Sequence, residues 1–572
     1  PETHVQRTLT AATLLATLAC SHSTPKSESP APAPAGAAAG SARTTPDITP
    51  ADLKTRLYAF ADDSMQGRKA GTIGNVKGTD YIAREAERIG LEPAGDDGGW
   101  FQTIPMANRV LDSSSSVTAG STTLHAWRDI VPRDQGTGAR SINGAQAIYG
   151  GVWSDKNDVM IPRDDAAGKL VVLTMAPGAD GKPAGLANRA VTTARFAKAA
   201  GIAVATLDAI GPSDRASLED GGARLTSGAK AGPETPSFFY VTTAGATAIM
   251  GAEPASLEPG AKGQTVHGRI AFADQQPAAP ARNVIAILRG SDPALRGEMV
   301  AIGAHNDHEG IFPMALDHDS IRAFNHVMRP GGANDNPGKP TDAQWTRIRH
   351  ELDSLRRVHK PRPDSIMNGA DDDGSGSVGV LEIAEYLAHA SERPRRSILF
   401  VWHTGEELGL IGSDYFTRHP TVPRDSIVAQ LNIDMIGRGE PDDIAGGGPG
   451  YLQVIGSRRL STELGDIVEA VNHEMTPSFH FDYSFDADGN PANYYCRSDH
   501  YMYARFGIPI AFFSSGSHRD YHQVTDEPQY IDYEKMAHVS RLVAATAVRI
   551  AALDHRVVVD KPKPDPDAPC KQ

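Results

Sequence analysis

The chain has 572 residues, of which 40% are hydrophobic and 22% charged, so it is long enough for two or three domains with sizeable cores. Its net charge of -14 and the lack of a basic patch argue against nucleic acid as a partner. Three cysteines are too few for a disulfide scaffold.

Residues 1–20 are predicted to be a signal peptide. Arg7 precedes an apolar run, residues 8–19, that is too short to span a bilayer but has the length of a signal-peptide core. Cys20 follows directly, and its lipidation would give a membrane tether; ordinary cleavage, or none, are the alternatives. Residues 21–47 are rich in Ser, Pro, Ala and Gly, which is typical of a disordered linker. We therefore expect an exported protein, either a lipoprotein of the periplasm or cell envelope, or secreted.

Two helices are predicted next, within a domain formed by residues 48–109 and 281–555. Thr49 and Pro50 have the chemistry of an N-cap and a first helical residue. An amphipathic helix around residues 80–89 is ended by Gly90.

Residues 110–280 follow a different pattern, with short apolar runs separated by Gly and Pro. Residues 169–174, 202–207 and 238–242 are such runs, and one helix is predicted over residues 191–200. The sequence therefore predicts a small β-rich domain, inserted into the first one.

From residue 283 onwards, predicted strands alternate with helices, which indicates an α/β fold with a mostly parallel, mixed sheet. In such folds, ligands collect at the carboxyl ends of the strands. The predicted strands are 284–288, 299–304, 398–402, 428–433, 451–455 and 508–513, and the predicted helices are 378–390, 460–472 and 534–553.

Acidic residues and histidines follow these strands. Three consecutive carboxylates, Asp371 to Asp373, also precede a helix; a solvated acidic N-cap is the alternative interpretation. Nitrogen and oxygen donors of this kind suit zinc, and the acid trio offers a carboxylate that could bridge two zinc ions. The residues after the strands are His305, Asp307, Glu406, Glu407, Asp434, His518, Asp520, Tyr521 and His522.

Taken in order, five motifs resemble those of the M28 family of di-zinc peptidases, most of which are aminopeptidases. They are Gly303-Ala-His-Asn-Asp-His308, Gly369-Ala-Asp-Asp-Asp-Gly-Ser-Gly376, Gly405-Glu-Glu-Leu-Gly-Leu-Ile-Gly-Ser413, Ile433-Asp434 and Tyr521-His522. The resemblance implies a three-layer sandwich of the zinc-exopeptidase kind. Within the insert, residues 194–204 resemble part of a protease-associated (PA) domain.

The resemblance also implies a role for each site residue. His305 and Asp434 would bind one zinc ion, Glu407 and His522 a second, and Asp372 would bridge the two. The peptide bond between Asp372 and Asp373 would be cis, and Asp307 would hold the His305 ring. Glu406 would be the general base, and Tyr521 would stabilise the oxyanion, with a packed aromatic ring as its alternative role.

The expected activity is the removal of N-terminal residues from peptide substrates. A carboxypeptidase and a glutaminyl cyclase of the same fold are alternatives. A binding protein that has lost catalysis is a further alternative, although every ligand position and Glu406 are intact.

The chain departs from the family in a long insertion, residues 308–370. It contains an amphipathic helix, 342–358, with Thr341 and Gln344 as a predicted capping box. Because such long insertions are usually functional or disordered, we interpret it as a lid over the substrate cleft. Residues 556–572 alternate Pro with charge and are predicted to be a loose tail. Cys496 is expected to be structural rather than nucleophilic.

Overall fold

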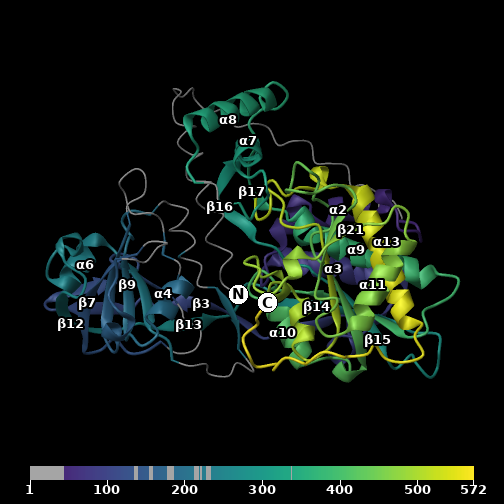
Figure 1. Ribbon diagram of the computed structural model, residues 1–572, viewed down its shortest axis with the longest axis horizontal. Helices are drawn as coiled ribbons and strands as arrows, with labels where there is room; N and C mark the ends of the chain where they lie inside the picture. Colours follow the sequence, from purple (N-terminus) through teal and green to yellow (C-terminus); the bar gives the residue numbers. More distant parts are fainter. Residues whose placement is uncertain are drawn as a thin grey trace. The chain divides into compact units, whose positions relative to one another are not determined.

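The computed structural model describes residues 44–572 apart from 134–138, 154–158, 177–185, 188, 211–217, 219–221, 227–233 and 336–337 (Figure 1). The predicted signal peptide, Cys20 and most of the predicted linker lie outside the described residues. Among the helices that are described, none has both the length and the apolar character needed to cross a membrane. The chain divides into two units, one formed by residues 44–104 and 278–572, the other by residues 105–277.

The first unit is built on a nine-stranded mixed sheet. Its central strands, β18, β15, β19 and β22, are parallel to one another, whereas β14 runs antiparallel to β18 and β20 runs antiparallel to β22. The strand order is β1-β14-β18-β15-β19-β22-β20-β21, with β2 pairing β14. The bounds are β1 Glu92–Pro93, β2 Phe101–Ile104, β14 Ala281–Leu288, β15 Met299–His305, β18 Ser397–His403, β19 Ile427–Ile433, β20 Tyr451–Ile455, β21 His480–Asp482 and β22 Ile510–Ser514.

Helices cover both faces of this sheet. Successive side chains of each strand point to opposite sides, and the apolar side chains on each side are buried under helices. Val284 and Ala286 belong to one core, while Ile285 and Ile287 belong to the other. The first core is closed by α2 (Pro50–Phe60), α3 (Ile73–Ile89), α9 (Gly376–His389), α11 (Thr462–Glu474) and α13 (Tyr533–Ala551), and the second by α10 (Ile411–Arg418) and α12 (His500–Ala504). The predicted alternation of strands and helices is confirmed.

The two N-terminal helices differ in how well the sequence placed them. As predicted, α2 begins at Pro50 and its N-cap Thr49 accepts a hydrogen bond from the Asp52 N–H. Helix α3 begins at Ile73, well before the predicted range. The prediction started too late because Gly74 and Gly78 lower the helix propensity of the first turns. A Cβ on Gly78 would lie 3.2 Å from the Arg68 side chain, so this glycine lets the short helix η2 (Asp63–Arg68) pack closely against α3.

The insertion of the first unit contains two paired strands and two helices. The predicted capping box of Thr341 and Gln344 is present at the start of α8, which ends at Leu355 rather than at Val358. Arg356 at its end donates to Asp319 at 2.6 Å, and Arg362 donates to the same carboxylate at 2.5 Å. The elements are β16 (Gly310–Asp317), α7 (His318–Met328), α8 (Asp342–Leu355) and β17 (Pro363–Met367).

The second unit, residues 105–277, is rich in β-strands. An eight-stranded sheet has the order β5-β4-β12-β7-β8-β9-β11-β6, and a three-stranded sheet has the order β10-β3-β13. The bounds are β3 Met106–Leu111, β4 Ser116–Ala119, β5 Thr122–His125, β6 Ile130–Arg133, β7 Ala145–Trp153, β8 Leu170–Met175, β9 Gly201–Ala205, β10 Ala223–Leu225, β11 Ser237–Val241, β12 Lys262–Arg269 and β13 Phe272–Gln275, with helices α4 Arg189–Arg195 and α6 Thr243–Met250.

Within this unit, the strands predicted over 169–174, 202–207 and 238–242 are observed as β8, β9 and β11. The helix predicted over 191–200 extends too far at its carboxyl end, since α4 stops at Arg195 in the structure. The following residues are already pairing with the start of β8: Gly168 N–H donates to the Lys198 carbonyl, and Ala200 N–H donates to the Lys169 carbonyl. These bonds turn the chain into β9.

Candidate metal centre

The candidate site residues lie where the central strands end. His305 is the last residue of β15, Asp434 follows β19 directly, and Glu407 follows β18 by a short turn. His522 comes from the loop after β22, and Asp372 from the turn before α9. Because these strands are parallel, their carboxyl ends meet at one edge of the sheet, which brings together residues that are far apart in sequence.

The Asp372 carboxylate stands between two groups of side chains. Its Oδ1 lies 3.1 Å from His305 Nε2, and its Oδ2 lies 3.0 Å from His522 Nε2. On the first side, Asp434 Oδ1 is 3.8 Å from His305 Nε2; on the second, Glu407 Oε2 is 3.0 Å from His522 Nε2. The structure therefore brings together all five residues predicted as metal ligands, with one carboxylate shared between the two groups.

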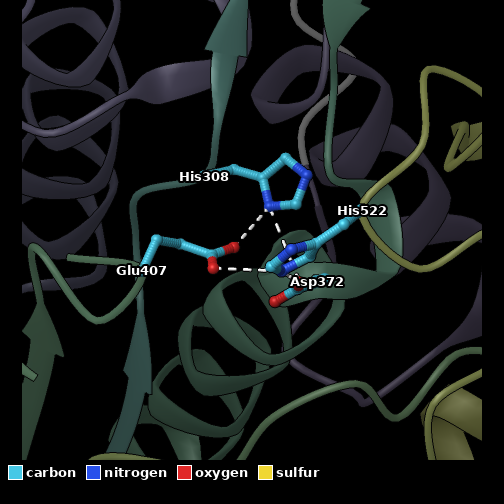
Figure 2. A group of neighbouring side chains, drawn as sticks. All are labelled: His308, Asp372, Glu407 and His522. Atoms are coloured by element: carbon cyan, nitrogen blue, oxygen red, sulfur yellow. Dashed lines mark hydrogen bonds and ion pairs between the residues drawn. The ribbon is translucent and has the colours of Figure 1, made fainter. Parts of the chain in front are cut away.

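His308 belongs to the second group, although the sequence reasoning assigned it no role. Figure 2 shows its ring beside Glu407, with Nδ1 2.8 Å from Glu407 Oε1 and 3.7 Å from Asp372 Oδ2. The ring packs against Gly369, where a Cβ would come within 2.5 Å of it and where φ is +54°. The only signal in the sequence is the His-x-x-His spacing from His305, which is weak by itself.

Asp373 lies beside the first group, because one of its oxygens is within 4.8 Å of a ligand atom of His305 and of Asp434. Its carboxylate accepts hydrogen bonds from three backbone N–H groups, those of His305 (3.1 Å), Gly376 (2.8 Å) and Met435 (3.2 Å). Because these bonds occupy both oxygens, Asp372 rather than Asp373 is the better bridging residue. The peptide bond between the two is cis, as the sequence resemblance implied.

Asp307 makes a different contact from the expected one. His305 Nδ1 lies 3.1 Å from the backbone carbonyl oxygen of Asp307 but 3.7 Å from its carboxylate, which is too long for a hydrogen bond. The carboxylate instead accepts the Glu406 N–H at 3.2 Å. Asp307 therefore holds the His305 ring through its main chain and the Glu406 loop through its side chain.

Glu406 and Tyr521 both face a pocket next to the two groups. The Tyr521 ring also stacks on His522, with ring centroids 3.9 Å apart. The pocket is lined by Asp372, Glu406, Asp434, Met435, Tyr494, Arg497, Ser498, Phe512, Ser514, Ser517 and Tyr521. His518 and Asp520, which follow the same strand, lie outside this lining: His518 Nε2 is 3.4 Å from Asp371, and Asp520 pairs with Arg438.

Burial and close charges shift the pKa values of the site in opposite directions. Burial opposes ionisation of Asp372, but hydrogen bonds from His305 and His522 outweigh it and hold the pKa of Asp372 well below its usual range. His522 and His308 lower the pKa of Glu407 to about 2 against burial and the Asp372 charge. Glu407 and Asp372 in turn raise the pKa of His522 well above its ordinary value, against the effect of its burial. The imidazoles therefore take the place that cations would take beside these carboxylates.

Two positioning residues hold the turn that carries Asp372. The buried Arg68 guanidinium donates to the carbonyl oxygens of Asn306 (3.2 Å), Asn368 (2.6 Å) and Gly369 (2.8 Å), as well as to that of Phe60. The Asp526 carboxylate accepts the N–H groups of Asp371 (3.0 Å) and Asp372 (3.1 Å). Neither residue was found from the sequence, because bonds to the main chain leave no pattern of side-chain types.

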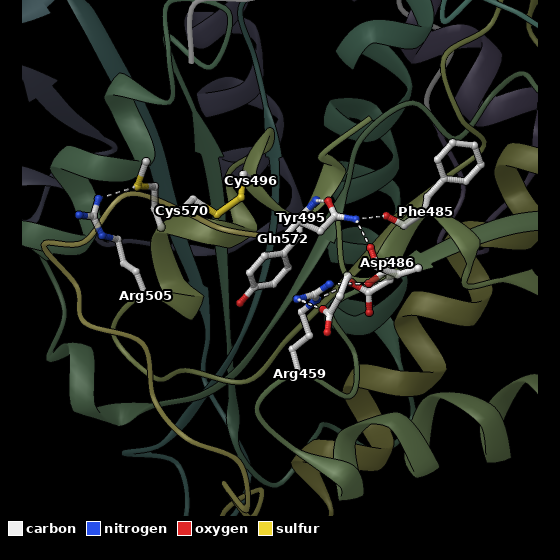
Figure 3. Close-up of a disulfide and its surroundings, with 11 residues drawn as sticks. Arg459, Phe485, Asp486, Tyr495, Cys496, Arg505, Cys570 and Gln572 are labelled. Atoms are coloured by element: carbon white, nitrogen blue, oxygen red, sulfur yellow. Dashed lines mark hydrogen bonds and ion pairs between the residues drawn. A yellow bond between two sulfur atoms is a disulfide. The ribbon is translucent and has the colours of Figure 1, made fainter. Parts of the chain in front are cut away.

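The segment around Cys496 supports Asp434. Ser498 donates to Asp434 Oδ2 at 2.7 Å and accepts a hydrogen bond from Asn432. Just before it, Cys496 forms a disulfide with Cys570 (Figure 3). The structural role expected for Cys496 therefore has a physical basis.

The prediction of a loose C-terminal tail was wrong for its last residues. The prolines and charges do prevent a helix or strand there, but the disulfide fixes Cys570, and Gln572 accepts the Tyr495 N–H and donates to the Phe485 carbonyl (Figure 3). The sequence showed the lack of regular structure but not the partner of Cys570.

Comparison with protein families identifies the segment that contains most of this site. Residues 350–547 match the model described as Peptidase family M28. They belong to peptidase family M28. The M28 segment contains Asp372, Glu406, Glu407, Asp434 and His522, whereas His305 and His308 precede it.

The curated relatives match only part of this chain. Leupeptin-inactivating enzyme 1 of Streptomyces exfoliatus is 31% identical over 169 residues, which are 29% of this chain and 33% of that protein. Leucine aminopeptidase 1 of Penicillium rubens is 27% identical over 197 residues, 32% of this chain and 47% of that protein. The chain thus spans between a third and a half of the length of these two relatives.

Solved structures similar to this chain include aminopeptidases. An aminopeptidase from Aneurinibacillus sp. strain AM-1 has a TM-score of 0.48 and 14% identity, covering 90% of this chain and 97% of that chain. BSAP, a zinc aminopeptidase from Bacillus subtilis, has a TM-score of 0.46 and 16% identity, with coverages of 88% and 96%. Values this low do not support a conclusion about the fold or the activity.

Replacement of Arg68 by Met is expected to destabilise the domain. The change leaves buried carbonyl oxygens at Asn306, Asn368 and Gly369 without their donor, so the free energy of unfolding should fall by at least about 3 kcal/mol. Urea unfolding followed by fluorescence measures it. The matched control is Arg84→Met, on the exposed face of α3, which should stay within about 0.5 kcal/mol of the wild type. Equal stability of the two variants would contradict the role of Arg68.

Proposed function

We propose that this protein is a zinc-dependent aminopeptidase with two metal ions at the Asp372 site. The observation that carries the proposal is the position of the Asp372 carboxylate, whose two oxygens face His305 on one side and His522 on the other. The M28 segment and the names of its relatives support hydrolysis of peptide bonds at the amino terminus.

The donors at this site fit zinc. They are imidazole nitrogens and carboxylate oxygens, few on each side, and every residue that supplies one, except Glu407, is nine-tenths buried or more. The exception in exposure is Glu407, which is half-buried as a residue although its side chain is 6% exposed. We assign His305 and Asp434 to one ion, Glu407 and His522 to the other, and Asp372 to both. His308 Nδ1, against Glu407 Oε1, would orient that carboxylate.

Hydrolysis of a peptide bond needs a group that transfers protons and a group that stabilises the negative charge that develops on the carbonyl oxygen. Zinc supplies Lewis acidity, which polarises a substrate carbonyl and lowers the pKa of water towards 7. Glu406, which faces the same pocket as Asp372, would take a proton from the attacking water and pass it to the leaving amine. The Asp307 carboxylate fixes the Glu406 main chain at 3.2 Å, and Tyr521 would donate a hydrogen bond to the carbonyl oxygen as charge develops.

Two further proposals concern the rest of the chain. The β-rich unit of residues 105–277 is proposed to be PA-like. The protein is proposed to be exported, because a disulfide such as Cys496–Cys570 persists in oxidising compartments.

Hydrolysis of a panel of aminoacyl-anilides and N-blocked peptides, with and without a chelator, tests the proposed activity. We expect chelator-sensitive release from free amino termini alone. Glu406→Gln should lower kcat by about 10²- to 10⁴-fold with zinc content unchanged, because it removes the proton carrier. Glu392→Gln, an exposed carboxylate before β18, is the control and should match the wild type. Cleavage of N-blocked peptides with a free carboxylate would instead indicate a carboxypeptidase.

Zinc content tests the bridging role of Asp372. Asp372→Asn should lose most of both zinc equivalents, because the amide is neutral and would serve both ions poorly, whereas Glu407→Gln should lose one. Elemental analysis of the purified, dialysed chain gives the counts, with the exposed Asp442→Asn as control. Loss of the same single equivalent in both site variants would contradict the shared carboxylate.

A further inference from the structure

A third group of potential metal ligands lies apart from the site at Asp372. One ring nitrogen of His318, one oxygen of Asp364 and one of Glu527 all lie within 4.8 Å of one another. His318 begins α7, Asp364 lies in β17, and Glu527 directly precedes the short helix η10 (Pro528–Tyr530). Two of the three residues therefore come from the insertion, and the third comes from the loop that follows His522.

Polar atoms at this group lack the partners that burial normally requires. His318 is 4% exposed, and its Nδ1 has no hydrogen-bond partner among the residues that the structure describes. Asn368, 2% exposed, donates through Nδ2 to Asp63 at 2.8 Å and to Glu527 Oε1 at 3.1 Å, yet its Oδ1 has no donor. Native structures rarely leave buried nitrogen and oxygen acceptors without a partner, and a bound cation can serve as the partner of such acceptors.

The two carboxylates of the group are not paired with a basic side chain in the described part of the chain. Burial, with added repulsion from Asp364 and Asp63, raises the pKa of Glu527 to about 8. A cation at this position would relieve the repulsion among the carboxylates.

The histidine of the group is suited to bind a metal. Burial and the nearby charges of Arg362 and Arg322 lower the pKa of His318 to about 4, which favours the neutral form of its ring. Both arginines are already engaged, Arg362 with Asp319 at 2.5 Å and Arg322 over the Tyr530 ring. A neutral imidazole with an unpartnered nitrogen keeps a lone pair available for a metal.

We propose that His318, Asp364 and Glu527 bind a divalent metal ion of the zinc class, separate from the site at Asp372. One imidazole and two carboxylates are the nitrogen and oxygen donors that zinc accepts. This proposal stands on its own residues and is independent of the proposed peptidase activity.

An ion there would join the insertion to the body of the domain. It would connect α7 and β17 to the loop that carries His522 and Glu527. Elsewhere, the insertion reaches the wall of the pocket: Asn334 donates to the Tyr494 hydroxyl at 2.7 Å, and Ala333 N–H donates to the Ser517 carbonyl. The ion would thus hold the insertion against residues that line the pocket.

Metal content of the full chain tests the proposal. The protein is stripped with a chelator, reloaded at a buffered free Zn²⁺ concentration and analysed for bound zinc. Asp364→Asn and His318→Gln should each bind one equivalent fewer than the wild type. Asp353→Asn, an exposed carboxylate of α8 outside the group, is the matched control and should bind as much as the wild type.

A double variant separates this site from the one at Asp372. Asp364→Asn combined with Glu407→Gln should lose the sum of the two single losses, and Asp364→Asn alone should keep the zinc of the Asp372 site. Wild-type zinc content in both Asp364→Asn and His318→Gln would overturn the proposal and leave a group of acids that share a proton.

Hydrogen exchange of the wild type gives a test that needs no variant. Addition of zinc to the stripped protein should slow amide exchange in residues 318–328 and 363–367. Slowed exchange around His305, Asp372 and His522 alone, with the insertion unchanged, would also overturn the proposal.

Discussion

The carboxylates buried at one edge of the sheet repel one another, and their repulsion is the constraint on which the rest of the site depends. Three kinds of group offset this repulsion. Backbone N–H groups bind Asp373 and Asp526, imidazoles lie against Asp372 and Glu407, and the Arg68 guanidinium lies under the turn that carries Asp372. Without these partners, ionised carboxylates at this burial would cost several kcal/mol each.

Much of the fold and of the site was predictable from the sequence for one physical reason. Strands buried on both faces appear as continuous apolar runs, and the residues that follow parallel strands meet at one edge. His305, Glu407 and Asp434 could therefore be grouped before their distances were known. Asp372 needed the family motif, because three consecutive acids do not by themselves show which one stands between the histidines.

Other features could not be read from the sequence, since they depend on contacts to the main chain or on folding at a distance. Arg68 and Asp526 act by binding backbone carbonyl and N–H groups, which every residue type provides. His308 enters the site because Gly369 leaves room for its ring. The pairing of Cys496 with Cys570 joins residues 74 apart in sequence, and nothing local predicts it.

X-ray diffraction data collected above and below the zinc absorption edge, on crystals of the zinc-loaded protein, test the central claim most directly. The account predicts two anomalous peaks on opposite sides of the Asp372 carboxylate, one beside His305 and Asp434, the other beside Glu407 and His522. A single peak at this edge of the sheet, or two peaks that do not share Asp372, would contradict it.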